Sequence, residues 1–156
     1  MRRIRLGEGL LGIGAIALFV LLFADWFKGG GVSASGWSSI GWVLDVLFAV
    51  VILLALTTVV LTAVGAKPAI ALGPGVITVT VAVITLPIAL VRVLITQPDL
   101  DIGLGNEAVK VQVAGYLGLV ALIMIVVGAW ITIADERTDA PDSAYTPPPP
   151  RAVPGS

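Results

Sequence analysis

The sequence predicts an all-α membrane protein, in which a bundle of four transmembrane helices is followed by a disordered C-terminal tail. Apolar residues make up 58% of the chain and charged residues 12%, whereas a soluble domain carries about 25% charged residues. Three long intervals contain no charged residue, and each can supply the roughly 20 apolar residues that a spanning helix needs. These intervals separate Asp45 from Lys67, Lys67 from Arg92, and Lys110 from Asp135.

Composition also limits the classes of function. The net charge is −1 and the Lys and Arg residues are scattered, so we expect no nucleic-acid partner. Cysteine and histidine are absent, which removes disulfides, thiolate nucleophiles, imidazole bases and the usual zinc, copper or haem ligands. We therefore expect no metal and no cofactor. Only Asp45, Arg92 and a few Ser and Thr side chains could cooperate inside the membrane, so the sequence predicts no enzyme.

The first predicted helix covers residues 6–27. It follows a basic N-terminus and ends beside Trp26 and Lys28, residue types that anchor helices at the membrane interface. The same features suit a secretory signal peptide with a small-residue cleavage site at residues 32–34. Both interpretations stay open, although the charged, aromatic and glycine-rich stretch before that site favours an uncleaved helix.

The second predicted helix covers residues 38–65 and the third covers residues 74–97. Tryptophan at the start of the second helix, Trp42, marks the membrane interface. The third helix is expected to start at Pro74, because proline is tolerated at the first position of a helix. Pro87 lies inside this helix and predicts a kink, since proline removes one backbone hydrogen bond.

The fourth predicted helix covers residues 111–134, with Trp130 as an anchor near its end. The membrane domain is therefore expected to cover residues 1–137. Residues 138–156 are polar and rich in proline and cannot build a core, so they predict a disordered tail. The proline run favours polyproline II, which suits either a spacer or a ligand for an adaptor domain.

Small residues predict which helix faces pack, because small side chains let helices in lipid approach closely. In the third helix such residues recur at spacings of three and four, which places them on one face that ends at Arg92. The fourth helix carries a similar seam. The predicted packing residues are Gly75, Thr78, Ala82, Thr85, Ala89, Gly118, Ala121 and Gly128.

Asp45 and Arg92 form a candidate ion pair within the membrane. Asp45 lies about seven residues into the second helix and Arg92 about five residues from the end of the third. Because the two helices run antiparallel, both side chains fall at a similar depth. An unpaired charge in the membrane costs at least about 2–3 kcal/mol, which favours pairing. The alternative is that each side chain reaches the interface separately, Arg92 by extending along its apolar stem.

The positions of Lys and Arg predict the orientation. If both termini face inward, Lys28, Arg92 and Lys110 lie outside and the other six Lys and Arg residues lie inside. The excess predicts cytoplasmic termini, with the proline-rich tail in the cytoplasm.

The chain also resembles a family of small, uncharacterised four-span membrane proteins of high-GC bacteria. The resemblance covers residues 6–137 and implies an architecture and a bacterial inner-membrane location. It implies no function, because no activity is established for that family. It is carried by Ala24-Asp25-Trp26-Phe27, by Ser35-Gly36-Trp37 with Asp45, by Arg92 followed by Pro98, and by Gly115-Tyr116-Leu117-Gly118-Leu119 with Ala134-Asp135-Glu136-Arg137.

The first functional hypothesis is an accessory or scaffolding subunit of a membrane assembly, because little of the chain lies outside the membrane and its helix faces suit packing. Its expected partners are the lipid bilayer and another membrane protein or a second copy of the chain. The alternative is a small oligomeric transporter or channel, since an intramembrane carboxylate such as Asp45 and a proline-kinked helix are parts that such proteins use.

Overall fold

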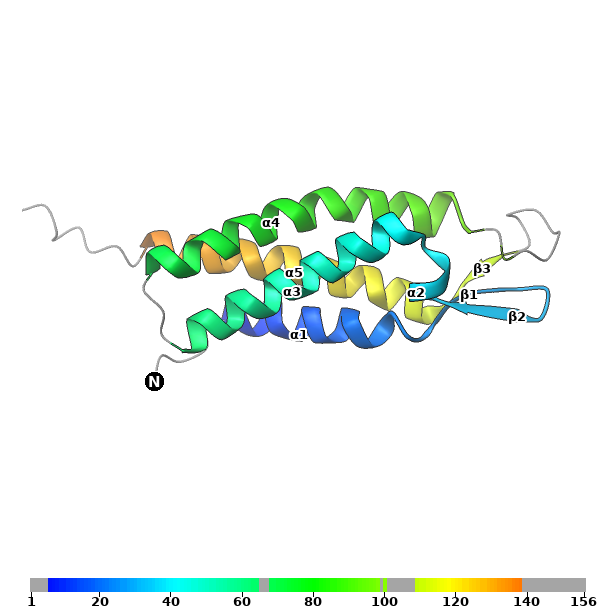
Figure 1. Cartoon of the computed structure of the whole chain (residues 1–156), viewed down its shortest axis with the longest axis horizontal. Helices are drawn as coiled ribbons and strands as arrows, with labels where there is room; N and C mark the ends of the chain where they lie inside the picture. The colour runs from blue at the N-terminus through cyan, green and yellow to red at the C-terminus, as the bar shows by residue number, and fades with distance from the viewer. Residues whose placement is uncertain (1–5, 65–67, 99, 101–108, 139–156) are drawn as a thin grey trace, which may run out of the picture.

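The computed structural model describes residues 6–64, 68–98, 100 and 109–138, and these are mostly helical (Figure 1). Four long helices and one short helix are α1 (Leu6–Leu21), α2 (Gly36–Ser39), α3 (Trp42–Ala63), α4 (Pro68–Leu90) and α5 (Val113–Thr138). A π-helical turn, η1 (Val91–Ile95), extends α4. The strands are β1 (Asp25–Gly29), β2 (Val32–Ser35) and β3 (Lys110–Val111).

The four long helices pack side by side with alternating direction (Figure 1). The most extensive contact joins α1 to α5, and further contacts join α1 to α3, α3 to α4, and α4 to α5. The start of α1 and the end of α5 lie at one end of the helices, and the strands lie at the other (Figure 1).

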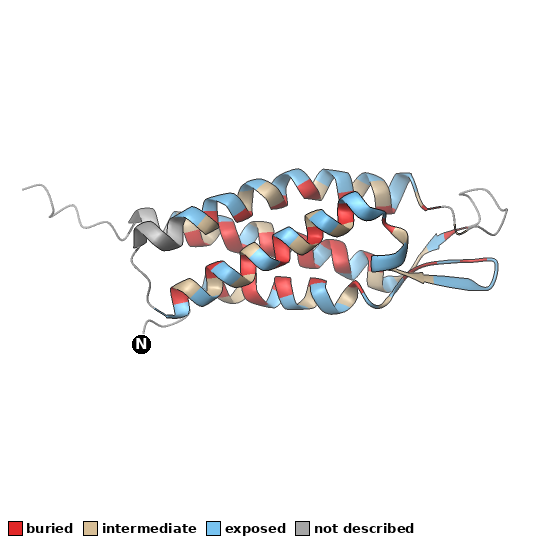
Figure 2. Ribbon diagram, viewed as in Figure 1, coloured by how far each residue is buried: buried red, intermediate tan, exposed pale blue. Residues whose placement is uncertain are grey.

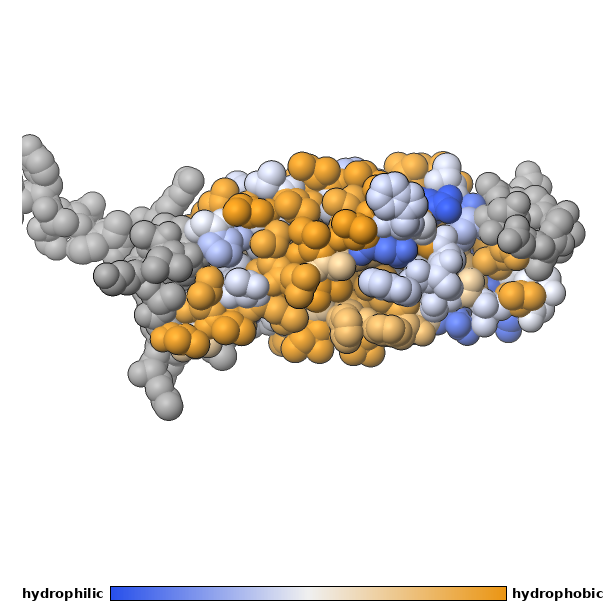
Figure 3. Space-filling model, viewed as in Figure 1, coloured by the Kyte–Doolittle hydropathy of each residue, from blue (hydrophilic) through white to orange (hydrophobic). Residues whose placement is uncertain are grey.

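Three helical stretches are long and apolar enough to cross a membrane, namely Trp42–Ala63, Gly73–Ile95 and Val113–Ala134. Their outward faces carry large aliphatic and aromatic side chains, and exposed residues alternate with buried ones along each helix (Figure 2). Figure 3 shows that apolar residues cover most of the helical surface on this face, whereas hydrophilic residues gather mainly toward the strands. An apolar exterior around an apolar core is the arrangement expected where lipid is the solvent.

The first helix is shorter than the sequence predicts. It ends at Leu21 instead of residue 27, although turn hydrogen bonds from the amides of Leu22, Phe23 and Ala24 continue it briefly. The reason is that Asp25–Gly29 forms strand β1, which pairs with β2 and β3. A prediction made from one segment at a time does not detect such pairing. The signal-peptide interpretation is not addressed by this geometry.

The second predicted helix is interrupted near its start. The short helix α2 (Gly36–Ser39) is separated from α3 by Gly41, whose φ of 100° lies in a region that favours glycine. The chain therefore turns at Ile40 and Gly41 before α3 begins at Trp42. Its end at Ala63 is close to the predicted end at residue 65, which lies outside the described residues.

The third and fourth helices also differ from their predicted bounds. Helix α4 begins at Pro68 and not at Pro74, because Pro68 satisfies the same preference for the first helical position. Pro74 and Pro87 both lie inside α4, and the helix is continuous through each; the kink at Pro87 stays a prediction. Helix α5 begins two residues late because Lys110–Val111 forms β3, and its backbone stays helical to Thr138. The rest of the predicted tail lies outside the described residues.

A small antiparallel sheet in the order β2-β1-β3 caps one end of the helices. The central strand β1 joins two connections that are distant in sequence, since Phe27 pairs with Ala34 on one side and Val111 on the other. In the same register Lys28 lies opposite Lys110, an arrangement of like charges that a sheet disfavours. Residues 25–35 and 110–111, which belong to different connections between helices, thus form one sheet.

The residues assigned to the predicted packing faces lie inside the structure. All eight residues assigned to them in the third and fourth helices are buried, with Thr78, Ala82, Thr85 and Ala89 fully so. The closest approach involves α5 and α1, where a Cβ added at Gly128 would lie 2.5 Å from the backbone nitrogen of Leu11. Real Cβ atoms do not come that near, so only glycine allows the observed crossing.

The prediction that Trp26 anchors the first helix at the membrane interface is wrong. The side chain is fully buried, whereas Trp42 and Trp130 are 77% and 67% exposed and suit the interface. Its ring fills a slot that only glycine allows, because a Cβ at Gly118 would lie 2.2 Å from the ring and one at Gly36 2.9 Å from it. The indole Nε1 donates a 2.6 Å hydrogen bond to the carbonyl of Leu21.

The close crossing predicts that Gly128→Ala lowers the free energy of unfolding by about 1–3 kcal/mol, because the methyl group must push two backbones apart. The matched control is Gly9→Ala, where an added Cβ meets nothing within 4 Å. This control should keep or slightly raise stability, since alanine is the better helix former. Unfolding of the purified chain by denaturant in mild detergent measures both. Equal stability of the two variants would contradict the assigned crossing.

Candidate functional site

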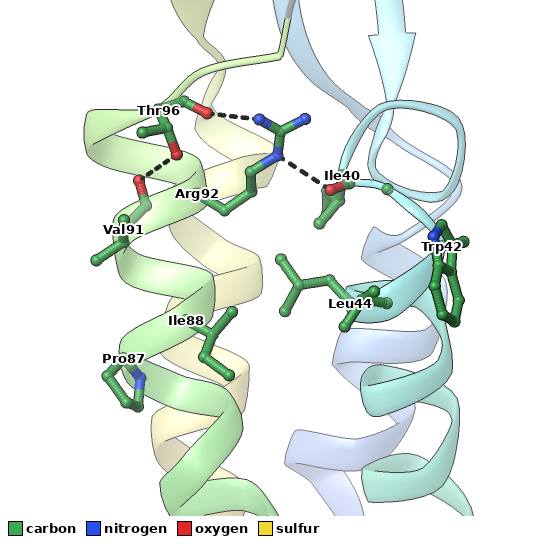
Figure 4. Close-up of a pocket in the computed structure, with 10 residues that line it drawn as sticks. Ile40, Trp42, Leu44, Pro87, Ile88, Val91, Arg92 and Thr96 are labelled. Carbon is green, nitrogen blue, oxygen red and sulfur yellow. Dashed lines mark hydrogen bonds between the residues drawn. The ribbon is translucent and has the colours of Figure 1, made fainter.

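A groove with a polar group at one end lies between the start of α3 and the end of α4 (Figure 4). It has a volume of about 640 Å³, which is within the usual range for ligand sites, about 300–1,000 Å³. One wall comes from residues 40–44. The other comes from Pro87, Ile88, Val91, Arg92 and Thr96. We refer to this feature as the Arg92 groove.

Most of the Arg92 groove is apolar. Leu44 and Ile88 point toward one another from the two walls (Figure 4). Pro87 and Val91 extend the α4 wall on either side of Ile88. The groove thus offers hydrocarbon contact over its length and one cationic group, Arg92, at the end nearest the strands (Figures 1 and 4).

Arg92 is fixed by two backbone carbonyl groups. Its Nε donates a 3.1 Å hydrogen bond to the carbonyl of Ile40, and its Nη1 donates a 2.9 Å hydrogen bond to the carbonyl of Thr96. The Ile40 bond links α4 to the turn before α3, and the Thr96 bond closes the end of η1 (Figure 4). Hydrogen bonds from a charged donor are among the stronger ones in proteins. The guanidinium therefore has a defined position at the mouth of the groove.

The π-helical turn helps to place Arg92. In η1 the amide of Thr96 donates to the carbonyl of Val91 at 2.8 Å, five residues back instead of four. The Thr96 hydroxyl donates to the same carbonyl at 3.3 Å. Arg92 lies within this turn and donates to the carbonyl of Thr96, the residue that ends it. Such turns occur often at functional sites.

The predicted ion pair between Asp45 and Arg92 is not formed among the described residues. Arg92 is bound to backbone carbonyls instead, and Asp45 Oδ1 is buried without a hydrogen-bond partner. The physical reason is the turn at Gly41, which presents the Ile40 carbonyl to Arg92. The alternative interpretation, in which each side chain reaches the membrane interface separately, stays a prediction.

Asp45 lies in the first turn of α3. The positive end of the helix dipole favours a carboxylate at this position. This offsets part of the cost of a charge at the edge of a membrane span. The local placement thus accounts for an acidic residue here without a cationic partner.

The sequence did not predict the groove or its link to Ile40. Gly41, between the Ser-Ser-Ile turn and Trp42, was the available signal, because an isolated glycine before an apolar run can mark a break. Which carbonyl the break frees, and which side chain reaches it, depends on how α3 and α4 pack. That information is not local in the sequence.

No protein-family model, curated protein or solved structure matches this chain. The resemblance to four-span bacterial membrane proteins therefore gains no support from these comparisons and stays a hypothesis.

The contacts of Arg92 predict the outcome of a double-mutant cycle. Arg92→Gln should lower the free energy of unfolding by about 1–3 kcal/mol, because two carbonyls lose a charged donor. Asp45→Asn should lower it by about 1 kcal/mol or less, since Oδ1 has no hydrogen bond to lose and only the interaction with the helix dipole is removed. The combined variant should show a coupling energy within about 0.5 kcal/mol of zero. Denaturant unfolding in detergent measures all three, and coupling of about 1 kcal/mol or more would establish the ion pair.

Proposed function

We propose that this chain is an accessory or scaffolding subunit of a membrane assembly. In this proposal it crosses the bacterial inner membrane four times, with both termini in the cytoplasm. The observation that carries the proposal is the packing between the helices, where the buried threonine hydroxyls are satisfied within their own helices, because such packing leaves the outer surface as the main part of the molecule available for function.

The core is apolar, and its hydroxyl groups are satisfied locally. Five buried threonines each donate to the carbonyl four residues earlier in their own helix, at 2.7–2.9 Å: Thr58, Thr62, Thr78, Thr85 and Thr132. Thr58 and Thr78 also meet across α3 and α4, with their oxygens 3.4 Å apart. Since both hydroxyl protons are already directed to carbonyls, this meeting is a packing contact. A transport route would need polar groups free to face a substrate.

Four crossings are supported by the arrangement of α1. At about 1.5 Å of rise per residue, its 16 residues extend about 24 Å, somewhat less than the roughly 30 Å hydrocarbon core of a bilayer. The turn bonds that follow, up to Ala24, lengthen the segment. Helix α1 also lies along α5, which is long enough to span. The distribution of Lys and Arg supports cytoplasmic termini.

The surface left for a partner consists of large apolar side chains. On α5 the residues that face outward recur at spacings of three and four: Tyr116, Val120, Ile123, Val127 and Trp130. The small residues are taken up by internal packing, so a partner would meet branched and aromatic side chains here. Such faces also suit contact with lipid. A cross-linking experiment distinguishes contact with lipid from contact with a partner protein.

Site-specific photo-cross-linking tests the accessory role. A photoreactive amino acid is placed at one exposed position in each long helix, Ile16, Val50, Ile84 or Val120, and the full chain is irradiated in its native membranes. Because a partner covers only part of the surface, we expect one helix face to cross-link a single foreign protein reproducibly and the remaining faces to cross-link lipid. Mass spectrometry after mild-detergent purification identifies the product.

Samples kept in the dark provide the control for each position. Cross-links to a second copy alone, or to no protein from any of the four positions, would overturn the accessory role. Stoichiometric recovery of the same foreign protein without cross-linking would support it further.

A small oligomeric transporter or channel is the second candidate, and one observation favours it. Asp45 Oδ1 is buried without a hydrogen-bond partner within a stretch long enough to span the membrane, and intramembrane carboxylates commonly serve ion or proton pathways. If cross-linking yields self-association only, flux in proteoliposomes follows as the test. Flux that Asp45→Asn abolishes would favour this candidate, and absence of flux in the unchanged protein would remove it.

A further inference from the structure

We infer that the Arg92 groove binds one anionic phospholipid, with the lipid phosphate at Arg92 and an acyl chain between α3 and α4. This inference concerns a ligand site and does not depend on the accessory role. It rests on the order of polar and apolar groups along the groove, on the unused donors of Arg92, and on where the groove lies relative to the membrane spans.

The groove lies at a membrane boundary. Its walls come from the start of one candidate span, Trp42–Ala63, and the end of another, Gly73–Ile95. Trp42 beside it is 77% exposed, as expected of a tryptophan at the level of lipid headgroups. A molecule in the groove would therefore have one end among headgroups and the other in hydrocarbon.

The chemistry of the groove follows the same order. Arg92 and Thr96 lie at the boundary end, whereas Leu44, Ile88 and Pro87 lie deeper along the helices (Figure 4). A phospholipid presents an acidic group followed by an apolar chain, in that order from the boundary inward. The groove and the lipid are thus complementary in both polarity and direction.

Arg92 is suited to an anion. The bonds to Ile40 and Thr96 use Nε and Nη1, and Nη2 has no partner among the described residues. No carboxylate within this part of the chain neutralises it, since Asp45 makes no ion pair with it. A guanidinium held rigidly with free N–H groups matches the geometry of a phosphate. The charge that a neighbouring acid would balance is available to a lipid headgroup.

Native mass spectrometry of the full chain in mild detergent tests the site. The probes are dioleoyl phosphatidylglycerol, dioleoyl phosphatidylcholine and inorganic phosphate, each titrated separately. We expect one phosphatidylglycerol to be retained at least about tenfold more tightly than phosphatidylcholine, and inorganic phosphate not to be retained. Equal retention of both lipids, or retention of inorganic phosphate alone, would overturn the proposal.

Two variants act on different parts of the groove. Arg92→Gln removes the charge and should weaken retention of phosphatidylglycerol about tenfold or more. Ile88→Trp fills the apolar part without touching the charge and should weaken it similarly. Ile88→Trp keeps the site testable if Arg92→Gln does not fold.

The controls match each variant. Ile84→Trp adds the same ring one turn away at an exposed isoleucine outside the groove. Lys28→Gln removes an exposed cation from β1 at the same end of the molecule. Both controls should retain phosphatidylglycerol within about twofold of the unchanged protein. Equal retention of phosphatidylglycerol by Ile88→Trp and Ile84→Trp would overturn the site. A dimer of the unchanged protein that only Ile88→Trp dissociates would also overturn it, because the groove would then hold a second copy of the chain.

Discussion

The burial of Trp26 sets the geometry on which the rest of this structure depends. Its indole nitrogen closes the end of α1 through the Leu21 carbonyl, and its backbone carbonyl accepts a 2.7 Å hydrogen bond from the amide of Gln112 just before α5. The ring lies against Gly118 and close to Phe48 of α3, with ring centroids 6.1 Å apart. One residue, through its side chain and its backbone carbonyl, thus joins the end of α1, the start of α5 and the sheet. A residue type usually assigned to the lipid interface acts here as an internal support.

This support explains which parts of the fold could be predicted. The buried faces of α4 and α5 follow from spacing alone, because small residues three and four apart lie on one side of a helix wherever that helix packs. The ends of the helices depend on distant partners. Residues 25–27 were predicted to complete the first helix, and they form part of a strand instead because residues 32–35 and 110–111 pair with β1. Hydropathy therefore predicts the apolar segments, and the pairing between connections decides their limits.

The candidate site shows the same division. The sequence placed Asp45 and Arg92 at similar depth and inferred attraction, since charge and depth are all that a single chain reveals. The structure offers Arg92 a different partner, the Ile40 carbonyl, because Gly41 interrupts the helix at that point. A neutral backbone carbonyl can accept from the guanidinium without bringing a carboxylate to it, whereas forming an ion pair would desolvate the carboxylate as well as the guanidinium. A backbone carbonyl freed at a helix break thus competes with a carboxylate for the guanidinium. The pattern of side chains in the sequence does not predict which carbonyl is freed.

Among the described residues, several polar groups that lack a hydrogen-bond partner or an opposite charge lie near the strands. Asp45 Oδ1 and the free edge of the Arg92 guanidinium lie there, as do the opposed lysines of β1 and β3. Toward the other end, the hydroxyls of Thr62 and Thr132 are satisfied by their own helices. A membrane protein keeps costly polar groups only where something offsets them. At Asp45 the dipole of α3 offsets part of this cost, and at Arg92 the proposed lipid phosphate would occupy the free guanidinium edge. A lipid ligand is therefore expected at this end, whereas the proposed protein partner is expected along the outward faces of the helices.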